Sequence, residues 1–389
     1  MLLIHALQLI CLLPVIGGSI YAVLCLISVL YFKASSKGSS ASAPRRPPLF
    51  WPPVTVLKPV CGLEKNLREN LRSACEQDYP EFQVVFSMQV SDDPALPLLK
   101  DLQREFGQEK VTIAVDDRQT APNGKVKNLL GGLPYARYDT LVISDSDILL
   151  PPDYLKAIVV PLQDTNVGYV CTLYKASHAD SWFEKLELLT INADVMSNIV
   201  FAHVSGVSKP CLGASTALHR SMLKEIGGLE ALGDYLVEDY EMGRRILKTG
   251  KKSAIVFHLV ETIVDLKSVR QWWTHQLYWD QNIRVVETAA FLGTIFIRAI
   301  PFAMIFAALR WDLLGVGVLT GAAFIRVSTA FGILRWGFQD REGVKWLALL
   351  PARDVAGLVS WVLAFTKRTV IWRGVEFILH RDGRMVACR

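Results

Sequence analysis

The 389-residue sequence has little charge for its length. Asp, Glu, Lys and Arg together make up 20% of it, whereas hydrophobic residues reach 51%. An average soluble domain holds roughly 25% charged residues, and here the apolar excess is concentrated at the two ends of the chain. We therefore expect membrane segments at both ends and not merely a larger core.

Clustered basic stretches are also missing from the middle of the chain, and the formal net charge is only +5 at pH 7. A protein that binds nucleic acid needs a basic face, so we expect no nucleic-acid partner. The sequence shows no internal repeat. Its only low-complexity segment, rich in Ser, Ala and Pro, runs from Gly38 to Pro53.

The seven cysteines form neither a C-x-x-C pair nor a zinc-type spacing with histidine. An odd and scattered set gives no support for a disulfide framework. Reduced thiols are typical of the cytoplasm, so we expect the part of the chain between the two apolar ends to face that compartment.

The N-terminal segment from Ala6 to Phe32 contains no charged side chain. About 20 apolar residues suffice to cross a bilayer, and no Lys or Arg precedes the run as in a secretory signal. Four basic residues follow at once, namely Lys33, Lys37, Arg45 and Arg46. The positive-inside rule places this end in the cytoplasm. We predict an anchor over residues 1–32, a linker over 33–53 and a cytosolic domain after it.

From Val54 onward, short apolar strands alternate with helical stretches. Strands are predicted at 54–57, 82–86, 111–115 and 141–143, and helices at 66–77, 94–106 and 123–130. This alternation indicates an α/β fold with a mostly parallel sheet and flanking helices. We assign residues 54–287 to this domain.

The strand predicted at 141–143 is followed by two carboxylates, Asp145 and Asp147. Open α/β sheets bind ligands at the carboxyl ends of their strands. A hard divalent cation there takes one or two protein carboxylates together with phosphate oxygens. The pair therefore predicts a divalent-cation site.

Two later stretches carry further functional signals. Glu238 and Asp239 precede Arg244 and Arg245, an order that suits a helix with acidic residues at its N-terminus. Residues 270–279 contain three Trp and one Tyr, which favour a membrane interface.

Three apolar blocks follow at 289–309, 313–334 and 346–365, which we assign to C-terminal membrane segments over 288–365. If all three crossed the membrane, the basic tail at 366–389 would lie outside, against the positive-inside rule. Because Pro351, Arg353 and Asp354 interrupt the third block, and ionisable residues are costly inside a bilayer, we expect it to be re-entrant or interfacial, with a cytosolic tail.

Six short motifs resemble, in order, those of the ceramide glucosyltransferases of glycosyltransferase family 21. They are Val54-Thr-Val-Leu-Lys58-Pro59, Gln77-Asp-Tyr-Pro80, Asp92-Asp93-Pro-Ala95, Lys125-Val-Lys-Asn128-Leu129, Asp145-Ser-Asp147 and Glu238-Asp239-Tyr240. The resemblance covers roughly Val54 to Arg284. Other stretches, such as Leu150-Pro-Pro-Asp-Tyr-Leu155, look closer to the bacterial hopanoid-associated members of that family.

The resemblance implies a GT-A fold and inverting transfer of glucose or N-acetylglucosamine from a UDP-sugar to the hydroxyl of a membrane lipid. It also implies an integral protein of the bacterial inner membrane with its catalytic domain in the cytoplasm. The roles carried over are nucleotide-sugar binding by Lys58, Asp92, Asp93, Lys125 and Asn128, Mg²⁺ or Mn²⁺ binding by Asp145 and Asp147, and base catalysis by Asp239 with Glu238 beside it.

One signature departs from the family. Its Gln/Arg-x-x-Arg-Trp pattern falls on His275 to Trp279, with Tyr278 where Arg is expected. We assign His275 and Trp279 to the catalytic site. Two alternatives follow from Tyr278: Arg284 or Arg353 supplies the missing positive charge, or the activity is altered or absent. Three hypotheses follow: a ceramide glucosyltransferase-like enzyme, a hopanoid glycosyltransferase, and a catalytically silent relative that binds a UDP-sugar or a lipid.

Overall fold

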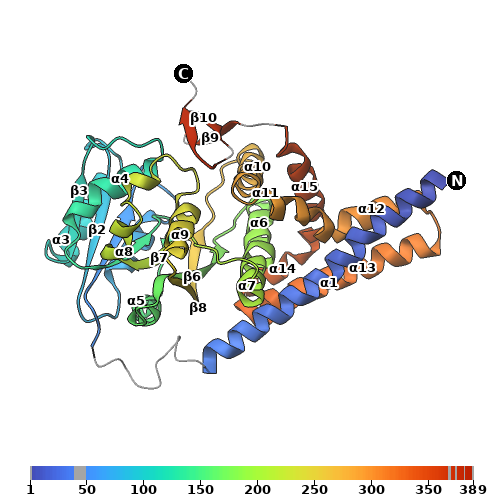
Figure 1. The fold of residues 1–389 in the computed structure, drawn as a ribbon, viewed down its shortest axis with the longest axis horizontal. Helices are drawn as coiled ribbons and strands as arrows, with labels where there is room; N and C mark the ends of the chain where they lie inside the picture. Colours follow the sequence, from blue (N-terminus) through green and yellow to red (C-terminus); the bar gives the residue numbers. More distant parts are fainter. Residues whose placement is uncertain (1, 39–49, 367–368, 373–374, 381, 388–389) are drawn as a thin grey trace.

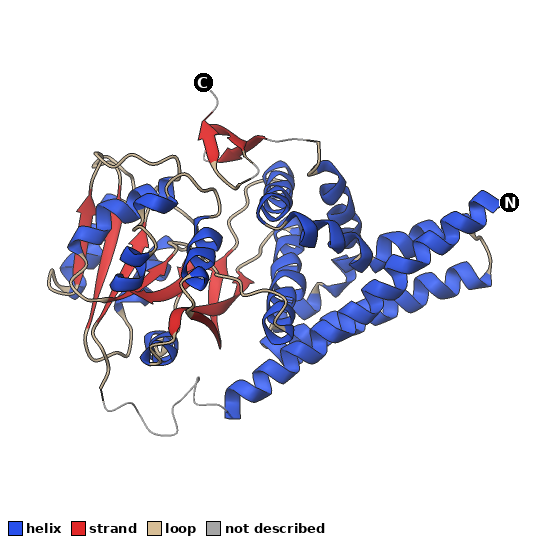
Figure 2. Cartoon of the chain, viewed as in Figure 1, coloured by secondary structure: helices blue, strands red, loops and turns tan. Residues whose placement is uncertain are grey.

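A computed structural model describes residues 2–38, 50–366, 369–372, 375–380 and 382–387. Figure 1 shows an α/β part at one side and a helical part at the other, with the N-terminus at the far end of the helical part. The same division is visible in Figure 2, where the large sheet lies apart from the long helices. The α/β architecture predicted from the sequence is confirmed.

The large sheet has eight strands in the order β3-β2-β1-β4-β7-β6-β8-β5. Strands β3, β2, β1 and β4 run parallel to one another, β7 is antiparallel to its neighbours β4 and β6, and β8 is parallel to β6 and antiparallel to β5. The bounds are β1 Val54–Pro59, β2 Phe82–Met88, β3 Val111–Val115, β4 Thr140–Ser144, β5 Ile148–Leu149, β6 Val167–Ser177, β7 Ser215–His219 and β8 Lys252–Ile263.

The first strands are buried along their whole length, as β1, β2 and β4 illustrate. Strands covered on both faces read as continuous apolar runs, which explains why the sequence marks them clearly. The helices of this part are α2 Leu67–Cys75, α3 Leu96–Phe106, α4 Gly124–Gly132, α5 Tyr154–Val159, α6 Trp182–Leu189, α7 Met196–Ser205, α8 Arg220–Glu225, α9 Glu238–Lys248 and α10 Val269–Val286. Short 3-10 turns are η1 Leu133–Tyr135, η2 Val160–Gln163 and η4 Glu230–Leu232, and the π-helical turn η3 Thr190–Val195 joins α6 to α7.

Among the residues that the structure describes, two helices are long and apolar enough to cross a membrane, or three if a bent pair counts as one span. The two are α1 (Leu2–Gly38) and α13 (Leu313–Gly332), which continues through the π-helical turn η6 (Ile333–Phe338). The end of α1, from Lys33 to Gly38, falls within the segment predicted as a linker, and the linker residues 39–49 lie outside the described residues.

The bent pair corresponds to the first predicted C-terminal block. It comprises α11 (Thr288–Gly293), η5 (Thr294–Ile297) and α12 (Ala299–Leu309), with a bend of 48°. The third block forms η7 (Leu347–Leu349) and α15 (Leu350–Leu363), after the short helix α14 (Arg341–Lys345). At 14 residues, α15 is shorter than the roughly 20 needed to span a bilayer.

The C-terminal tail is folded, which the sequence interpretation did not predict. Its strands β9 (Thr369–Trp372), β10 (Val375–Leu379) and β11 (Met385–Ala387) form a three-stranded antiparallel sheet. Figure 1 places this sheet beside α10, at the boundary between the α/β part and the helical part. Of the basic residues predicted for the tail, Lys367, Arg368, Arg373 and Arg381 lie outside the described residues.

Candidate active site

Lys125 lies at the centre of the candidate site. Its Nζ is 2.7 Å from Asp145 Oδ1 and 2.9 Å from Glu238 Oε1, and it donates a hydrogen bond of 3.1 Å to the carbonyl of Gly213. The lysine lies in the first turn of α4, Asp145 follows β4, and Glu238 begins α9. Three predicted motifs that are far apart in the sequence therefore converge on one ammonium group.

Asn123 supports this arrangement, although the sequence analysis gave it no functional role. Its side-chain oxygen caps α4 by accepting from the backbone amides of Lys125 and Val126 at 2.9 and 3.1 Å. Its Nδ2 donates to Glu238 Oε2 at 3.1 Å and to the Tyr235 carbonyl at 2.9 Å. The predicted helix begins at Asn123, whereas the observed helix begins at Gly124 with Asn123 as its N-cap. An Asn at a helix start is a recognisable N-cap signal, but its second set of contacts depends on the tertiary structure.

Asp239 follows Glu238 in the first turn of α9, next to this group. Its Oδ1 accepts from the backbone amide of Tyr240 at 2.8 Å. Gly213 faces its other oxygen, because a Cβ atom on Gly213 would lie only 2.7 Å from Asp239 Oδ2. Burial and the neighbouring Glu238 raise the pKa of Asp239 to about 7, while Lys125 acts in the opposite direction. A carboxyl with this pKa can exchange a proton near neutral pH.

Negative charge exceeds positive charge at this edge of the sheet. Burial raises the pKa of Asp145 to about 6, and repulsion from Asp147 adds to the shift while Lys125 opposes it. The pKa of Asp147 is raised as well, first by burial and then by Glu64. Burial works against the charge of Lys125, but Asp145 and Glu238 raise its pKa well above the ordinary value.

The excess of carboxylates fits a divalent cation. Asp147 Oδ2 accepts from Thr262 Oγ1 at 2.9 Å, while Asp145 faces Lys125. Within the described part of the chain, no three His, Cys, Asp or Glu side chains form a ready-made metal cage. Mg²⁺ commonly uses one or two protein carboxylates and completes its shell with water and phosphate oxygens, so two crowded aspartates suit it without a third protein ligand.

Lys58, predicted to attend the pyrophosphate, is fully buried. Its Nζ donates to the carbonyls of Asp145 and Ile148 at 2.7 and 3.0 Å. Burial lowers its pKa to about 8, although Asp147 and Asp145 favour its charged form. Its structural role is therefore to hold the turn that carries the two aspartates.

The remaining residues predicted to bind the nucleotide sugar surround the loop after β1. Asp93 is buried, and its two carboxylate oxygens accept from the Gly62 amide at 3.1 and 2.9 Å. Asn128 Nδ2 donates to the Val60 carbonyl at 3.0 Å. Asp92 is exposed beside Asp93. Asp93 and Asn128 thus fix the loop that borders the predicted nucleotide side of the sheet.

His275 and Trp279 lie on α10, in contact with α6. Trp279 Nε1 donates to His275 Nε2 at 2.9 Å, which leaves Nδ1 of this histidine to pair with Glu187 Oε1 at 3.0 Å. Tyr278 stacks on the histidine ring with a centroid separation of 6.4 Å. Burial raises the pKa of Tyr278 to about 12, and the charges of Glu238 and Asp239 contribute to the shift. Tyr278 also packs against the apolar cluster around Leu236, in the segment that precedes Glu238.

A cavity of about 180 Å³ lies where α10 meets the apolar helices. Trp279 lines it from α10, Tyr21 from α1 and Phe291 from α11. Arg298, at the bend before α12, also faces it. The bend is packed closely against α1, because Cβ atoms on Gly17 and Gly18 would each lie 2.7 Å from a carbonyl oxygen of η5. The cavity therefore joins the α/β part to the membrane helices.

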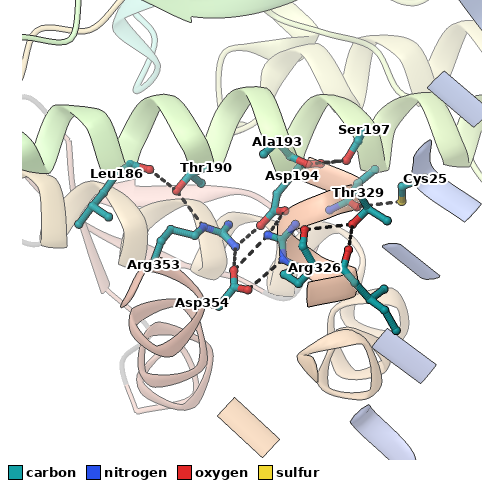
Figure 3. A network of polar contacts seen from close by, with 12 residues as sticks. Cys25, Leu186, Thr190, Ala193, Asp194, Ser197, Arg326, Thr329, Arg353 and Asp354 are labelled. Carbon is teal, nitrogen blue, oxygen red and sulfur yellow. Dashed lines mark hydrogen bonds and ion pairs between the residues drawn. The ribbon is translucent and has the colours of Figure 1, made fainter. Parts of the chain in front are cut away.

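Four charged side chains form a network in the wall of this cavity (Figure 3). Arg326 pairs with Asp194 at 2.6 Å and with Asp354 at 2.9 Å. Arg353 pairs with Asp354 at 3.1 Å, contacts Asp194, and donates to Thr190 Oγ1 at 3.1 Å. Two arginines and two aspartates balance, so the network adds no net charge to the cavity wall.

The network explains why these ionisable residues are present among apolar blocks. Thr190 and Asp194 lie in the π-helical turn η3, Arg326 in α13, and Arg353 and Asp354 in α15. π-helical turns occur frequently at functional sites. Two arginines were considered as substitutes for the charge missing at Tyr278. Arg353 pairs with Asp194 and Asp354 in this network. The guanidinium of Arg284 lies 5.7 Å from the centroid of the Phe365 ring.

Known proteins resemble the chain in sequence and, more weakly, in structure. Ceramide glucosyltransferase 1 of Caenorhabditis elegans is 30% identical over 214 residues, which cover 53% of this chain and 44% of the relative. Ceramide glucosyltransferase 3 of the same organism is 27% identical over 212 residues, covering 53% and 45%. The matched region thus spans less than half the length of these relatives.

Two solved structures cover most of the chain at low similarity. The mannosyltransferase PcManGT from Pyrobaculum calidifontis, in complex with GDP-Man and Mn²⁺, is 19% identical, with a TM-score of 0.46 over 87% of this chain and 99% of the other. S. aureus TarS 1–349 in complex with UDP-GlcNAc is 13% identical, with a TM-score of 0.40 over 86% and 99%.

The family model for glycosyl transferase family 21 matches residues 20–385, and the chain belongs to this family. The family predicted from the sequence motifs is thereby confirmed.

Proposed function

We propose that the protein is an inverting GT-A glycosyltransferase that moves a sugar from a UDP-sugar to the hydroxyl of a membrane lipid. The observation that carries the proposal is the convergence of Asp145, Glu238 and Lys125 beside Asp239, whose pKa is raised to about 7. Asp239 serves as the general base that takes the proton of the acceptor hydroxyl, because a base works best with a pKa near the working pH.

In this proposal, the donor and the acceptor approach from different sides. The UDP-sugar lies along the carboxyl ends of β1 and β4, near Asp93 and Asp145. When bound by Asp145 and Asp147, Mg²⁺ or Mn²⁺ would neutralise negative charge on the departing UDP. Lys125 lies between Asp145 and Glu238 and pairs with both carboxylates, so it fixes their positions relative to Asp239.

The acceptor lipid enters from the cavity between α10 and the apolar helices. Trp279 faces this cavity, and the adjacent Tyr278 packs against the apolar cluster around Leu236, in the segment directly before Glu238 and Asp239, so α10 connects the lipid side to the segment that bears the proposed base. The charge-balanced wall of Arg326, Arg353, Asp194 and Asp354 suits an uncharged head group with hydroxyl and amide groups. A ceramide-type lipid has this chemistry, and a hopanoid polyol is the alternative.

We further propose that the protein lies in a bacterial inner membrane with its catalytic domain in the cytoplasm. Lys33, near the end of α1, donates to the carbonyls of Trp336 and Gly337 at 2.6 and 2.8 Å. The basic end of α1 and the end of η6 therefore lie together, on the side where the chain continues to the sheet. A protease added to sealed inside-out vesicles digests the α/β part if this orientation is right and leaves it intact if it is wrong.

The deciding experiment is sugar transfer by the full chain in membranes. Radiolabelled UDP-glucose and UDP-N-acetylglucosamine are each offered with ceramide and with a hopanoid, with and without a chelator. We expect a labelled lipid from one pairing, a loss of product with the chelator, and a fall of about 10²–10⁴-fold in Asp239→Asn. Asp101→Asn, on the exposed surface of α3, is the matched carboxylate control and keeps wild-type activity.

The result also distinguishes the third hypothesis. UDP-sugar binding without transfer to either acceptor would show that the chain is a silent relative, with Tyr278 as the first residue to exchange for Arg. Transfer that is unaffected by Asp239→Asn would refute the assignment of the base while leaving the transferase intact.

A further inference from the structure

The C-terminal sheet pairs with the backbone directly before the acidic motif. The Met385 amide donates to the Asp234 carbonyl at 2.8 Å, and the Leu236 amide donates to the Gly383 carbonyl at 3.3 Å. Between them, Tyr235 and Arg384 form an antiparallel bridge. Addition of a strand in this way is a common mode of backbone recognition. Here the added strand belongs to the chain's own tail.

Apolar side chains reinforce the backbone pairing. Phe377, Leu379 and Met385 of the tail are buried together with Leu236, at 5%, 7%, 2% and 6% exposure. Partly buried neighbours of this cluster are Val237, Tyr278 and Val285. The tail thus contacts the acidic motif's own segment and the same helix, α10, that carries Tyr278.

The segment from Asp234 to Val237 is held from its other side as well. Asn123 donates to the carbonyl of Tyr235 at 2.9 Å and to Glu238 Oε2 at 3.1 Å, and it also caps the helix that bears Lys125. The segment therefore lies between the Asn123 cap and the tail. Because α9 begins at Glu238, a shift of this segment moves both Glu238 and Asp239 relative to Lys125.

The turn before β11 is suited to this position. The Gly383 amide donates to the His380 carbonyl at 3.0 Å, and the His380 amide donates to the Arg384 carbonyl at 2.9 Å. Gly383 has a φ of +86°, a conformation that residues with a side chain rarely adopt. The turn thus presents the Gly383 carbonyl to Leu236 with a defined geometry.

We propose that the C-terminal sheet is a positioning element for the acidic motif, with Met385 and Phe377 holding Asp234–Val237 so that Asp239 is aligned for proton transfer. This inference rests on the proposed function. Neither tail residue touches the reacting atoms. A displacement of about 1 Å in a reacting group costs as much as 10²-fold in rate, so the tail affects turnover without contributing a catalytic group.

The test compares three substitutions in the full chain. Met385→Ser removes a buried apolar anchor, Met385→Leu preserves it, and Val386→Ser changes the neighbouring residue, whose side chain is 52% exposed. We expect kcat to fall by at least about 10-fold in Met385→Ser, with KM for the UDP-sugar within about two-fold because the residues predicted to bind the nucleotide lie around the β1 and β4 loops. We expect Met385→Leu and Val386→Ser each to have the kcat of the wild type.

A double-mutant cycle distinguishes a specific coupling between the tail and the acidic motif from a general loss of folding. Leu236→Ala and Met385→Ser lie in one cluster, so their effects on kcat are expected to be non-additive, as for residues in contact. If Met385→Ser does not fold, Phe377→Leu and Leu236→Ala take its place in the same measurements. An unchanged kcat in folded variants, or losses that Met385→Leu fails to restore, overturns the inference.

The two levels of the proposal give different results. A wild-type chain that transfers no sugar to either acceptor refutes the proposed function and, with it, this positioning role. A wild-type chain that is active, together with a fully active Met385→Ser, refutes only the positioning role.

Discussion

The charge network in the cavity wall gives a quantitative prediction. Arg326 has side-chain contacts with both Asp194 and Asp354 at 2.6 and 2.9 Å, and its side chain is 14% exposed. Arg326→Met removes one of two cations and leaves two aspartates to share Arg353. Breaking a buried ion pair by deleting one partner costs about 3–5 kcal/mol because it leaves an uncompensated charge.

The measurement is thermal unfolding of the purified full chain in detergent. We expect Arg326→Met to lower Tm by roughly 5 °C or more, given a loss of that size in a chain of this length. The double variant Arg326→Met/Asp354→Asn restores the balance of one cation and one anion, so its loss should be smaller than that of Arg326→Met alone. Arg310→Met, an arginine in an exposed pair with Asp312, is the control.

Two outcomes would refute this reasoning. A loss below about 1 kcal/mol in Arg326→Met would mean that the pairs behave like exposed ones, which contribute little. A double variant less stable than Arg326→Met would mean that hydrogen bonding or packing, and not charge balance, determines the stability of the network.

Three further predictions concern the acidic cluster. First, kcat/KM should rise as the pH increases through about 7, because burial and Glu238 raise the pKa of Asp239 to about 7 and only the deprotonated base accepts the proton. A flat profile of kcat/KM between pH 6 and 8 would contradict this prediction. Second, Gly213→Ala should lower kcat at least about 10-fold with little change in Tm, because its Cβ would lie 2.7 Å from Asp239 Oδ2. Gly317→Ala is the control: no atom lies within 4 Å of its Cβ position, so its kcat should equal that of the wild type. Third, Asn123→Ala should cost about 1 kcal/mol of stability as a lost N-cap and also lower kcat, because it loses the bond donated to Glu238. Asn123→Asp should keep the cap but lose that bond, so its kcat should fall as well; a wild-type kcat in Asn123→Asp would refute the second role of Asn123.

Local patterns predicted much of the α/β part. The strands β1, β2, β3 and β4 were expected close to their observed bounds, because their residues are mostly apolar, and β1, β2 and β4 are buried along their whole length. The first apolar helix was likewise evident from the absence of charge between Ala6 and Phe32. Such signals depend only on neighbours along the chain.

The candidate site was predicted in its parts and not in its assembly. The motifs around Asp145 and Asp239 were identified, but the sequence did not show that Lys125 lies between Asp145 and Glu238. Nor did it show that Lys58 is buried beneath the aspartate turn instead of being open to a ligand. These features depend on which strand ends meet at the sheet edge.

By itself, the sequence determined the family, the apolar ends and the alternation of strands and helices, because each of these is written in adjacent residues or in ordered motifs. Only the tertiary structure decided that Asp194 pairs with both Arg326 and Arg353, and that the tail's Met385 packs against Leu236 beside the acidic motif. Such contacts join residues more than a hundred positions apart. Their formation depends on how whole helices and sheets dock, which no local pattern specifies.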